Sequence, residues 1–246
     1  MNEQTIWDSR AKDFAKLPIP DWRSDALLMC IGRTHTGGYG SALDIGCGAG
    51  QVSIALSLRF SSVTGLDISP AMIHEAKRLA ESEGVPNAEF MSSDWNSDGW
   101  RGGLDRSYDL ILANMTPAII SQSSLDRMCQ LCTGTCYVVI GTDSMDPHMD
   151  AVCEMLEVER RCTESPPILD LLERMGHDPS VETWDAEKRM SRSVEEIASF
   201  YRARLFPDGT DEETDVRIHG YFQSKSVNGR VEERIPFKKN AIWWRP

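Results

Sequence analysis

Three glycines at alternate positions, Gly46, Gly48 and Gly50, follow an acid, Asp44, in the run SALDIGCGAG. Glycine adopts backbone angles that other residues avoid, and it lets the main chain come within van der Waals distance of a ligand. A dinucleotide-binding loop would have a further glycine at position 51, where this chain has Gln51. The run therefore indicates a nucleotide-type ligand on a tight turn, with a spacing that differs from the dinucleotide pattern.

A second acid stands at the distance that such a ligand requires. The ribose hydroxyls of a nucleotide-type ligand are held by an acid about 20 residues further on, at the end of the next strand. The β-rich run 62–67 ends in Asp67, and Ile68, Ser69 and Pro70 then begin a helix. The alternative is a glycine-rich turn with a solvated aspartate. Two markers in register at strand-to-helix junctions favour the ligand site.

The glycine run and Asp67 together resemble motif I and the ribose-binding acid of the class I S-adenosylmethionine-dependent methyltransferases. The resemblance covers residues 41–142 at the level of motifs. It implies an α/β, Rossmann-like fold with a seven-stranded, mostly parallel sheet, an antiparallel last strand and helices on both faces. It also implies S-adenosylmethionine as the cofactor and methyl donor.

The same resemblance implies roles for individual residues. Asp44 and the loop 46–50 would face the amino-acid end of the cofactor, Asp67 would accept both ribose hydroxyls, and Ile68 would lie on the adenine. Asp94 would accept the adenine amino group, with Trp95 packed nearby. The full set expected at the cofactor is Asp44, Gly46, Cys47, Gly48, Gly50, Asp67, Ile68, Met72, Ser93, Asp94, Trp95 and Asn114.

The residues after the fourth predicted strand, Asn114-Met115-Thr116-Pro117, would line the gap between the methyl group and its acceptor. Enzymes that methylate amino nitrogens of nucleobases or the amide of glutamine have Asn/Asp-Pro-Pro-Tyr/Phe here, and this chain lacks the adjacent proline and the aromatic ring. A small-molecule acceptor is therefore favoured. The full set expected at the acceptor is Trp7, Arg10, Phe14, Met115, Thr116, Pro117 and His148.

No catalytic residue follows from the sequence. The leaving group is a neutral thioether, so alignment of nucleophile, methyl and sulfur can supply most of the rate. A base is needed only if the acceptor must first lose a proton. Among the five histidines, His148 is the candidate to test, although a surface histidine is the more common case.

Alternating strands and helices position these residues. Such an alternation predicts a parallel, doubly wound sheet with its ligand at the carboxyl ends of the strands. The pattern predicts strands over 41–45, 62–67, 88–91, 108–113 and 136–141, and helices over 51–60, 69–83 and 121–131. Beyond residue 142 it predicts helices over 149–162, 166–176 and 193–205, a strand over 181–186, a solvated turn over 208–215 and an antiparallel strand over 242–244.

We expect one methyltransferase domain over residues 1–246. Its parts would be an N-terminal helical lid (1–40), the S-adenosylmethionine-binding core (41–142), an insertion (143–164) and the C-terminal part of the sheet with its helices (165–246). Trp7, Arg10 and Phe14 stand at helical spacing and can share one face. That face could cover a ligand, or it could simply pack on the domain.

Composition limits the partners. The formal net charge of −12 and the pI near 4.9 disfavour nucleic-acid binding. The basic residues near the end of the chain are interpreted as salt-bridged strand surface: Lys225, Arg230, Arg234, Lys238, Lys239 and Arg245. The chain has no run of 18 apolar residues, so no membrane span is expected. The N-terminus does not resemble a signal peptide, and a cytoplasmic location is expected. The oligomeric state stays open.

The seven cysteines do not suggest disulfide bonds in such a chain. Cys129, Cys132 and Cys136 are interpreted as buried hydrophobic residues without a nearby histidine, and no metal is expected. Whether other cysteines converge on the methyl group, as arsenite methylation would need, is left open. The remaining alternatives are a protein or RNA methyltransferase and a non-catalytic S-adenosylmethionine-binding module.

Overall fold

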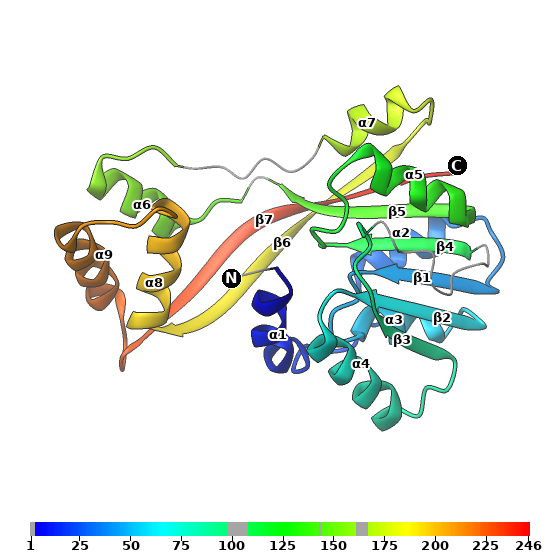
Figure 1. Ribbon diagram of the computed structural model, residues 1–246, viewed down its shortest axis with the longest axis horizontal. Helices are drawn as coiled ribbons and strands as arrows, with labels where there is room; N and C mark the ends of the chain where they lie inside the picture. The colour runs from blue at the N-terminus through cyan, green and yellow to red at the C-terminus, as the bar shows by residue number, and fades with distance from the viewer. Residues whose placement is uncertain (1–2, 98–107, 143, 161–166) are drawn as a thin grey trace. The chain divides into compact units, whose positions relative to one another are not determined.

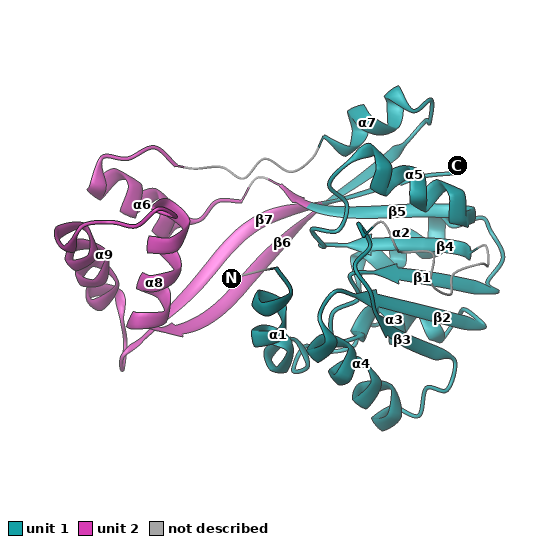
Figure 2. Ribbon diagram, viewed as in Figure 1, with its two compact units in different colours: residues 1–140, 166–183, 240–246 teal, residues 141–165, 184–239 magenta. Residues whose placement is uncertain are grey.

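The computed structural model describes residues 3–97, 108–142, 144–160 and 167–246. Contacts divide the chain into two compact units (Figure 2). The first consists of residues 1–140, 166–183 and 240–246, and the second of residues 141–165 and 184–239. The predicted insertion 143–164 lies within the second unit. Among the described residues, none of the helices is both long enough and apolar enough to cross a bilayer.

The sheet contains seven strands in the order β3-β2-β1-β4-β5-β7-β6 (Figure 1). It is parallel from β3 to β5, and its last strands are antiparallel, which confirms the predicted fold. The strands are β1 (Ser41–Ile45), β2 (Ser62–Asp67), β3 (Ala88–Ser92), β4 (Tyr108–Asn114), β5 (Cys132–Thr142), β6 (Ser180–Ser193) and β7 (Arg230–Trp244).

The register brings the functional positions to one edge of the sheet. Asp44 in β1 is opposite Gly65 in β2 and Leu112 in β4, and Asp67 at the end of β2 is opposite Ser92 at the end of β3. The carboxyl ends of parallel strands meet at the same edge. The glycine loop, Asp67 and the residues after β3 and β4 therefore share that edge.

Several helices of the first unit begin at polar caps that their sequences supply. Ser69 caps α4 through a bond from the Met72 amide at 3.1 Å, with Pro70 in the first turn, as predicted. Asp25 caps α2 in the same way, and its Oδ1 accepts from the Leu28 amide at 3.0 Å. The helices are α1 (Glu3–Phe14), α2 (Ala26–Thr34), α3 (Gln51–Ser57), α4 (Pro70–Ser82), α5 (Gln122–Leu131) and α7 (Ile168–Arg174).

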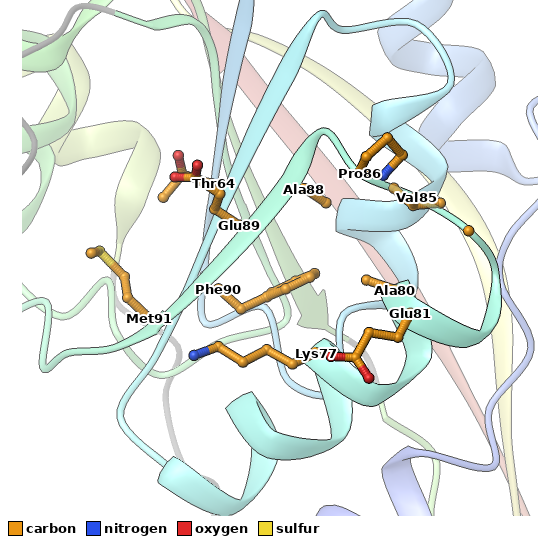
Figure 3. Close-up of a pocket in the computed structure, with 11 residues that line it drawn as sticks. Thr64, Lys77, Ala80, Glu81, Val85, Pro86, Ala88, Glu89, Phe90 and Met91 are labelled. Carbon is orange, nitrogen blue, oxygen red and sulfur yellow. The ribbon is translucent and has the colours of Figure 1, made fainter.

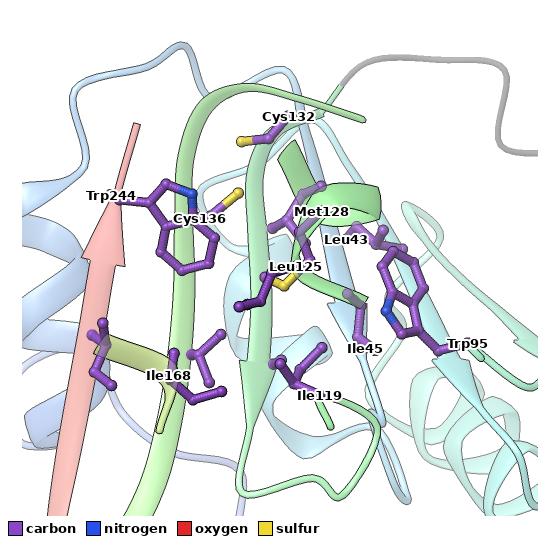
Figure 4. Packing of buried hydrophobic residues seen from close by; sticks show 14 of the residues in the cluster. Leu43, Ile45, Trp95, Ile119, Leu125, Met128, Cys132, Cys136, Ile168 and Trp244 are labelled. Carbon is purple, nitrogen blue, oxygen red and sulfur yellow. The ribbon is translucent and has the colours of Figure 1, made fainter. Parts of the chain in front are cut away.

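A hydrophobic core forms where α5 packs against the central strands (Figure 4). Cys132 and Cys136 are buried in it, in agreement with their interpretation as small hydrophobic residues. Cys129 differs, because its Sγ lies 3.4 Å from Nε2 of His177, which follows α7. The expectation of no nearby histidine is wrong, since a contact across 48 residues leaves no trace in local spacing. Among the described residues, no group of three or more His, Cys, Asp or Glu side chains could hold a metal ion.

The second unit contains α6 (Pro147–Leu156), α8 (Val194–Leu205), α9 (Glu212–Lys225) and parts of β5, β6 and β7. The capping box at Ser193 and Glu196 is present, as predicted for α8. Tyr201 of α8 donates its hydroxyl to Asp146, the N-cap of α6, at 2.8 Å. Residues 161 and 162, at the end of the predicted helix 149–162, lie outside the described residues.

The solvated turn predicted over 208–215 is correct for residues 208–211 but wrong for residues 212–215, which form the first turn of α9. Asp211 caps this helix, accepting from the Thr214 amide at 2.7 Å. The acids that follow stand in its first turn, where the helix dipole favours negative charge. Ile218 and Phe222, one turn apart, are both fully buried. Their burial, together with the cap, outweighs the polar character of the run.

The last two strands are longer than predicted, 180–193 in place of 181–186 and 230–244 in place of 242–244. Val231, Glu233 and Ile235 are buried at alternate positions of β7, while the residues between them are exposed. Because one of the buried positions is occupied by the charged Glu233, the sequence does not show a clear alternation of apolar and polar residues, which is the pattern that predicts a strand. The expectation of basic strand surface is confirmed for Arg230, Arg234 and Lys238, which are exposed on β7, but Lys225 is the last residue of α9 and Arg245 follows β7.

Candidate functional site

The glycine loop joins β1 to α3 in a conformation that only glycine tolerates well. Gly46 has φ +68° and Gly50 has φ +89°. A Cβ atom at Gly46 would lie 2.1 Å from Oγ1 of Thr116, and one at Gly50 would lie 2.9 Å from Cβ of Ala76. The chain therefore needs glycine here both for its backbone angles and for close packing. This packing sets the loop directly against the segment that follows β4.

Asp67 is bound to the glycine loop on one side and to the start of α4 on the other. Its Oδ2 accepts from the Gly48 amide at 2.9 Å, and its Oδ1 accepts from the Ser69 amide at 2.9 Å. Burial raises the pKa of Asp67, and the nearby charges of Asp8 and Glu3 raise it further against these two bonds. A carboxylate has about four acceptor positions, so two remain. Asp67 thus fits a vicinal diol, the feature expected of a ribose.

Asp44 lies beneath the loop. Its side chain is 1% exposed, and its Oδ2 accepts from Oγ of Ser53 at 2.6 Å. Burial raises the pKa of Asp44 to about 7, although the Ser53 bond acts in the opposite direction. Cys47 is also buried, and desolvation raises the pKa of its thiol well above the ordinary value. Contact of either residue with a cofactor stays a prediction.

The segment that begins at the end of β4 contains a residue with a left-handed backbone, Met115, and a residue with a buried side-chain oxygen, Asn114. Met115 has φ +54°, is 44% exposed and donates its amide to the Val139 oxygen at 2.9 Å. The Oδ1 atom of Asn114 is buried, and no donor in the described part of the chain reaches it. A buried acceptor without a partner is costly, so Asn114 fits a ligand that brings a donor such as an ammonium group. Thr116 contacts the glycine loop, and Pro117 is exposed.

Four of the other residues expected at the cofactor fall into two groups, and the fifth, Ile68, is half-buried directly after Asp67. Ser93 donates its amide to the main-chain oxygen of Asp67 at 2.9 Å. Asp94 is exposed and accepts from the Asn96 amide at 2.8 Å. Trp95 is 2% exposed and packs in the core around α5, and Met72 is 1% exposed beneath α1. The structure gives Trp95 and Met72 packing roles, since neither presents a free face to a ligand.

The N-terminal helix α1 packs on α4 and reaches the glycine loop (Figure 1). Trp7 and Phe14 make an edge-to-face contact with centroids 6.0 Å apart, and the Arg10 guanidinium lies 4.9 Å and 5.3 Å from the two ring centroids. Cδ1 of Phe14 lies 3.6 Å from where a Gly48 Cβ would be. The three predicted acceptor-side residues thus share one face of α1. Their contact with an acceptor stays a prediction.

Gln51 was not predicted as a site residue. Its Nε2 donates to the main-chain oxygens of Phe14 at 2.7 Å and Leu17 at 3.4 Å, which ties the end of α1 to the start of α3. The only signal in the sequence is the departure from glycine at this position. His148 lies in the second unit, where its Nδ1 is 3.0 Å from the Tyr221 hydroxyl, and its role stays a prediction.

A surface hollow of about 690 Å³ lies between α4 and β3 (Figure 3). Lys77 and Glu81 line it from α4, and Phe90 and Met91 line it from β3. None of the residues expected at the cofactor or acceptor is in its lining. The geometry of the glycine loop, and not this hollow, therefore defines the candidate site.

Comparisons with known proteins agree with that geometry. Residues 42–136 match a family model described as a methyltransferase domain. Over 75 residues the chain is 36% identical to the aklanonic acid methyltransferase DauC of Streptomyces sp. (strain C5), a match that covers 29% of this chain and 33% of that protein. Over 127 residues it is 28% identical to the 2-heptyl-1-hydroxyquinolin-4(1H)-one methyltransferase of Mycobacteroides abscessus, covering 50% of this chain and 56% of that protein.

Solved structures show the same fold. A putative methyltransferase of Bacillus halodurans C-125 aligns with a TM-score of 0.55 and 16% identity, over 90% of this chain and 98% of that one. The chain spans about a third to just over half of the length of the two relatives named above. Residues 42–136 thus match a methyltransferase domain, and the chain has the Rossmann-like fold of solved methyltransferase structures.

Proposed function

We propose that this protein transfers a methyl group from S-adenosylmethionine to a small-molecule acceptor, by in-line displacement, in the cytoplasm. The observation that carries the proposal is Asp67, which two amides orient beside the glycine loop and which, within the described part of the chain, keeps acceptor positions for a ligand. The match of residues 42–136 to a methyltransferase domain supports it independently. The names of the two relatives, a methyltransferase of aklanonic acid and one of 2-heptyl-1-hydroxyquinolin-4(1H)-one, support the small-molecule acceptor.

The residues of this chain bind and orient. When bound, S-adenosylmethionine supplies an electrophilic methyl group whose leaving group is a neutral thioether. Asp67 would hold the ribose diol, the glycine loop would let the main chain lie against the cofactor, and the Asn114 oxygen would accept from the cofactor's ammonium group. Holding the methyl in line with the acceptor can supply most of the rate without an acid catalyst.

The acceptor side would be formed by the residues after β4. Met115 is held exposed by a left-handed backbone, and such strain is commonly found at functional sites. Its flexible thioether and the ring of Pro117 would give the acceptor an apolar contact surface. A net charge of −12 argues against RNA as the acceptor, because it repels a phosphate backbone.

Transfer of a labelled methyl group tests the proposal. The purified protein is incubated with methyl-labelled S-adenosylmethionine and the separated metabolite, RNA and protein fractions of one extract. Label is expected in the metabolite fraction. Asp67→Ala should strongly reduce it, whereas replacement of Asp170, an exposed acid on α7, by alanine should leave it unchanged. Label in RNA or protein would favour the macromolecular alternatives. Binding of the cofactor without label in any fraction would favour the non-catalytic module.

A further inference from the structure

Ser69 donates hydrogen bonds to two carboxylates, those of Asp67 and Asp8. Asp8, on α1, accepts from the Ser69 hydroxyl and from the Ala71 amide, which lies 3.2 Å from its Oδ1. Asp67 accepts from the amide of the same serine at 2.9 Å. Ser69 is fully buried and lies between the two carboxylates. Through Asp8, α1 brings a formal negative charge to the start of α4, beside the proposed ribose-binding acid.

The negative charge of Asp8 contributes to the raised pKa of Asp67. Repulsion from Asp8, and from Glu3 one turn earlier in α1, adds to burial in raising the pKa of Asp67. The donors that face both acids are a hydroxyl and backbone amides, which are neutral groups. A helix N-terminus compensates only about half of one charge. A ligand that brings positive charge to this point would therefore be attracted.

The methyl donor and its product differ in charge at that point. S-adenosylmethionine has a sulfonium, whereas S-adenosylhomocysteine has a neutral thioether. In both, the sulfur is attached to C5′ of the ribose whose diol Asp67 is proposed to hold. The sulfur would thus lie one sugar away from the diol that Asp67 is proposed to hold, and Ser69 joins Asp67 to Asp8. At such separations in a partly buried site, electrostatic attraction is weakened but not abolished by solvent.

We propose that Asp8 is a specificity-determining residue that, with Asp67, favours the cationic methyl donor over the neutral product. The inference rests on the proposed function. It assigns to α1 a role in ligand affinity beyond covering the ligand. Transfer removes the sulfonium charge, so the site binds the product more weakly than the methyl donor. Product release would thereby be coupled to the helix that carries Asp8.

Titration calorimetry with both ligands tests the inference. Asp8→Asn keeps an oxygen acceptor and nearly the same volume but removes the charge. The ratio of the two dissociation constants is expected to shift about twofold to tenfold toward the product, and the shift should shrink between about 50 mM and about 500 mM salt. Asp13→Asn is the matched control, because Asp13 is exposed on the same helix and pairs with Lys16 at 2.8 Å. Its ratio should not change.

Each other outcome has a distinct meaning. If Asp8→Asn weakens both ligands equally, Asp8 only caps α4 or anchors α1, and the inference is overturned. An unchanged ratio with unchanged affinities overturns it as well. If the wild-type protein binds neither ligand while its circular dichroism shows a folded chain, the proposed function itself fails.

Discussion

The side-chain amide of Gln51 donates a hydrogen bond to the main-chain oxygen of Phe14, with 2.7 Å between the two atoms. Gln51 is the first residue of α3 and Phe14 is the last residue of α1, so one side chain joins the glycine loop to the N-terminal helix. Gln51 is 8% exposed, which shields the bond from water. The position where a dinucleotide loop has glycine is thus used here to anchor a helix.

Gln51→Ala should release the end of α1. Loss of the donor leaves the Phe14 oxygen without this partner, at a cost of about 1–3 kcal/mol to the docking of α1. Amide hydrogen exchange should become faster in residues 3–17 and stay unchanged in the central strands. Gln4→Ala, at an exposed position of the same helix, is the control. Equal protection of α1 in the wild type and in Gln51→Ala would show that the contact does not hold the helix.

Gly46→Ala should be far more destabilising than Gly84→Ala. Both glycines have nearly equal φ, +68° and +65°, so the backbone strain of the two alanines is similar, about 1 kcal/mol. At Gly46 the new methyl would also lie 2.1 Å from Thr116 Oγ1, whereas nothing lies within 4 Å at Gly84. Urea unfolding should show an extra loss of about 1–3 kcal/mol at Gly46.

Thr116→Gly in the Gly46→Ala background separates the two causes. It removes the side chain with which the methyl collides, so it should restore part of the extra loss. If the two glycine variants unfold at the same urea concentration, the close approach of the loop to the segment after β4 is wrong.

The sequence predicted most of what local pattern determines. The spacing from Gly46 to Asp67, the cap at Ser69 and the five parallel strands all follow from residues close in the chain. Helix α9 was missed because its first turn is acidic, and its apolar side consists of Ile218 and Phe222, which are buried one turn apart. The contact of Gln51 with Phe14 joins residues 37 apart, and no local period reports it.

The pH dependence of stability should carry the signature of Asp44. Its pKa is about 7 in the folded protein, above the ordinary value of 3.8, because the carboxyl is buried. The folded state therefore holds the proton more tightly than the unfolded state. The stabilisation that the protonated Asp44 contributes to the folded state is fully present below about pH 3.8 and is lost as the pH rises through about 7.

Asp44→Asn, which cannot ionise, should remove this part of the pH dependence. Its free energy of unfolding should fall less than that of the wild type between pH 4 and pH 8, with a difference of up to about 4 kcal/mol. Urea unfolding at a series of pH values measures it. A wild-type protein that is more stable at pH 8 than at pH 5, with no change in the variant, would contradict the assignment to Asp44.

The central claim is that Asp67 holds the ribose of S-adenosylmethionine, and titration calorimetry with S-adenosylhomocysteine tests it most directly. The wild type should bind one equivalent. Asp67→Ala should bind tenfold to a hundredfold more weakly, about 1.5–3 kcal/mol, since two charge-assisted hydrogen bonds are lost. Asp170→Ala should bind like the wild type. An unchanged affinity in a folded Asp67→Ala variant would mean that another group holds the ribose and that the proposed site is wrong.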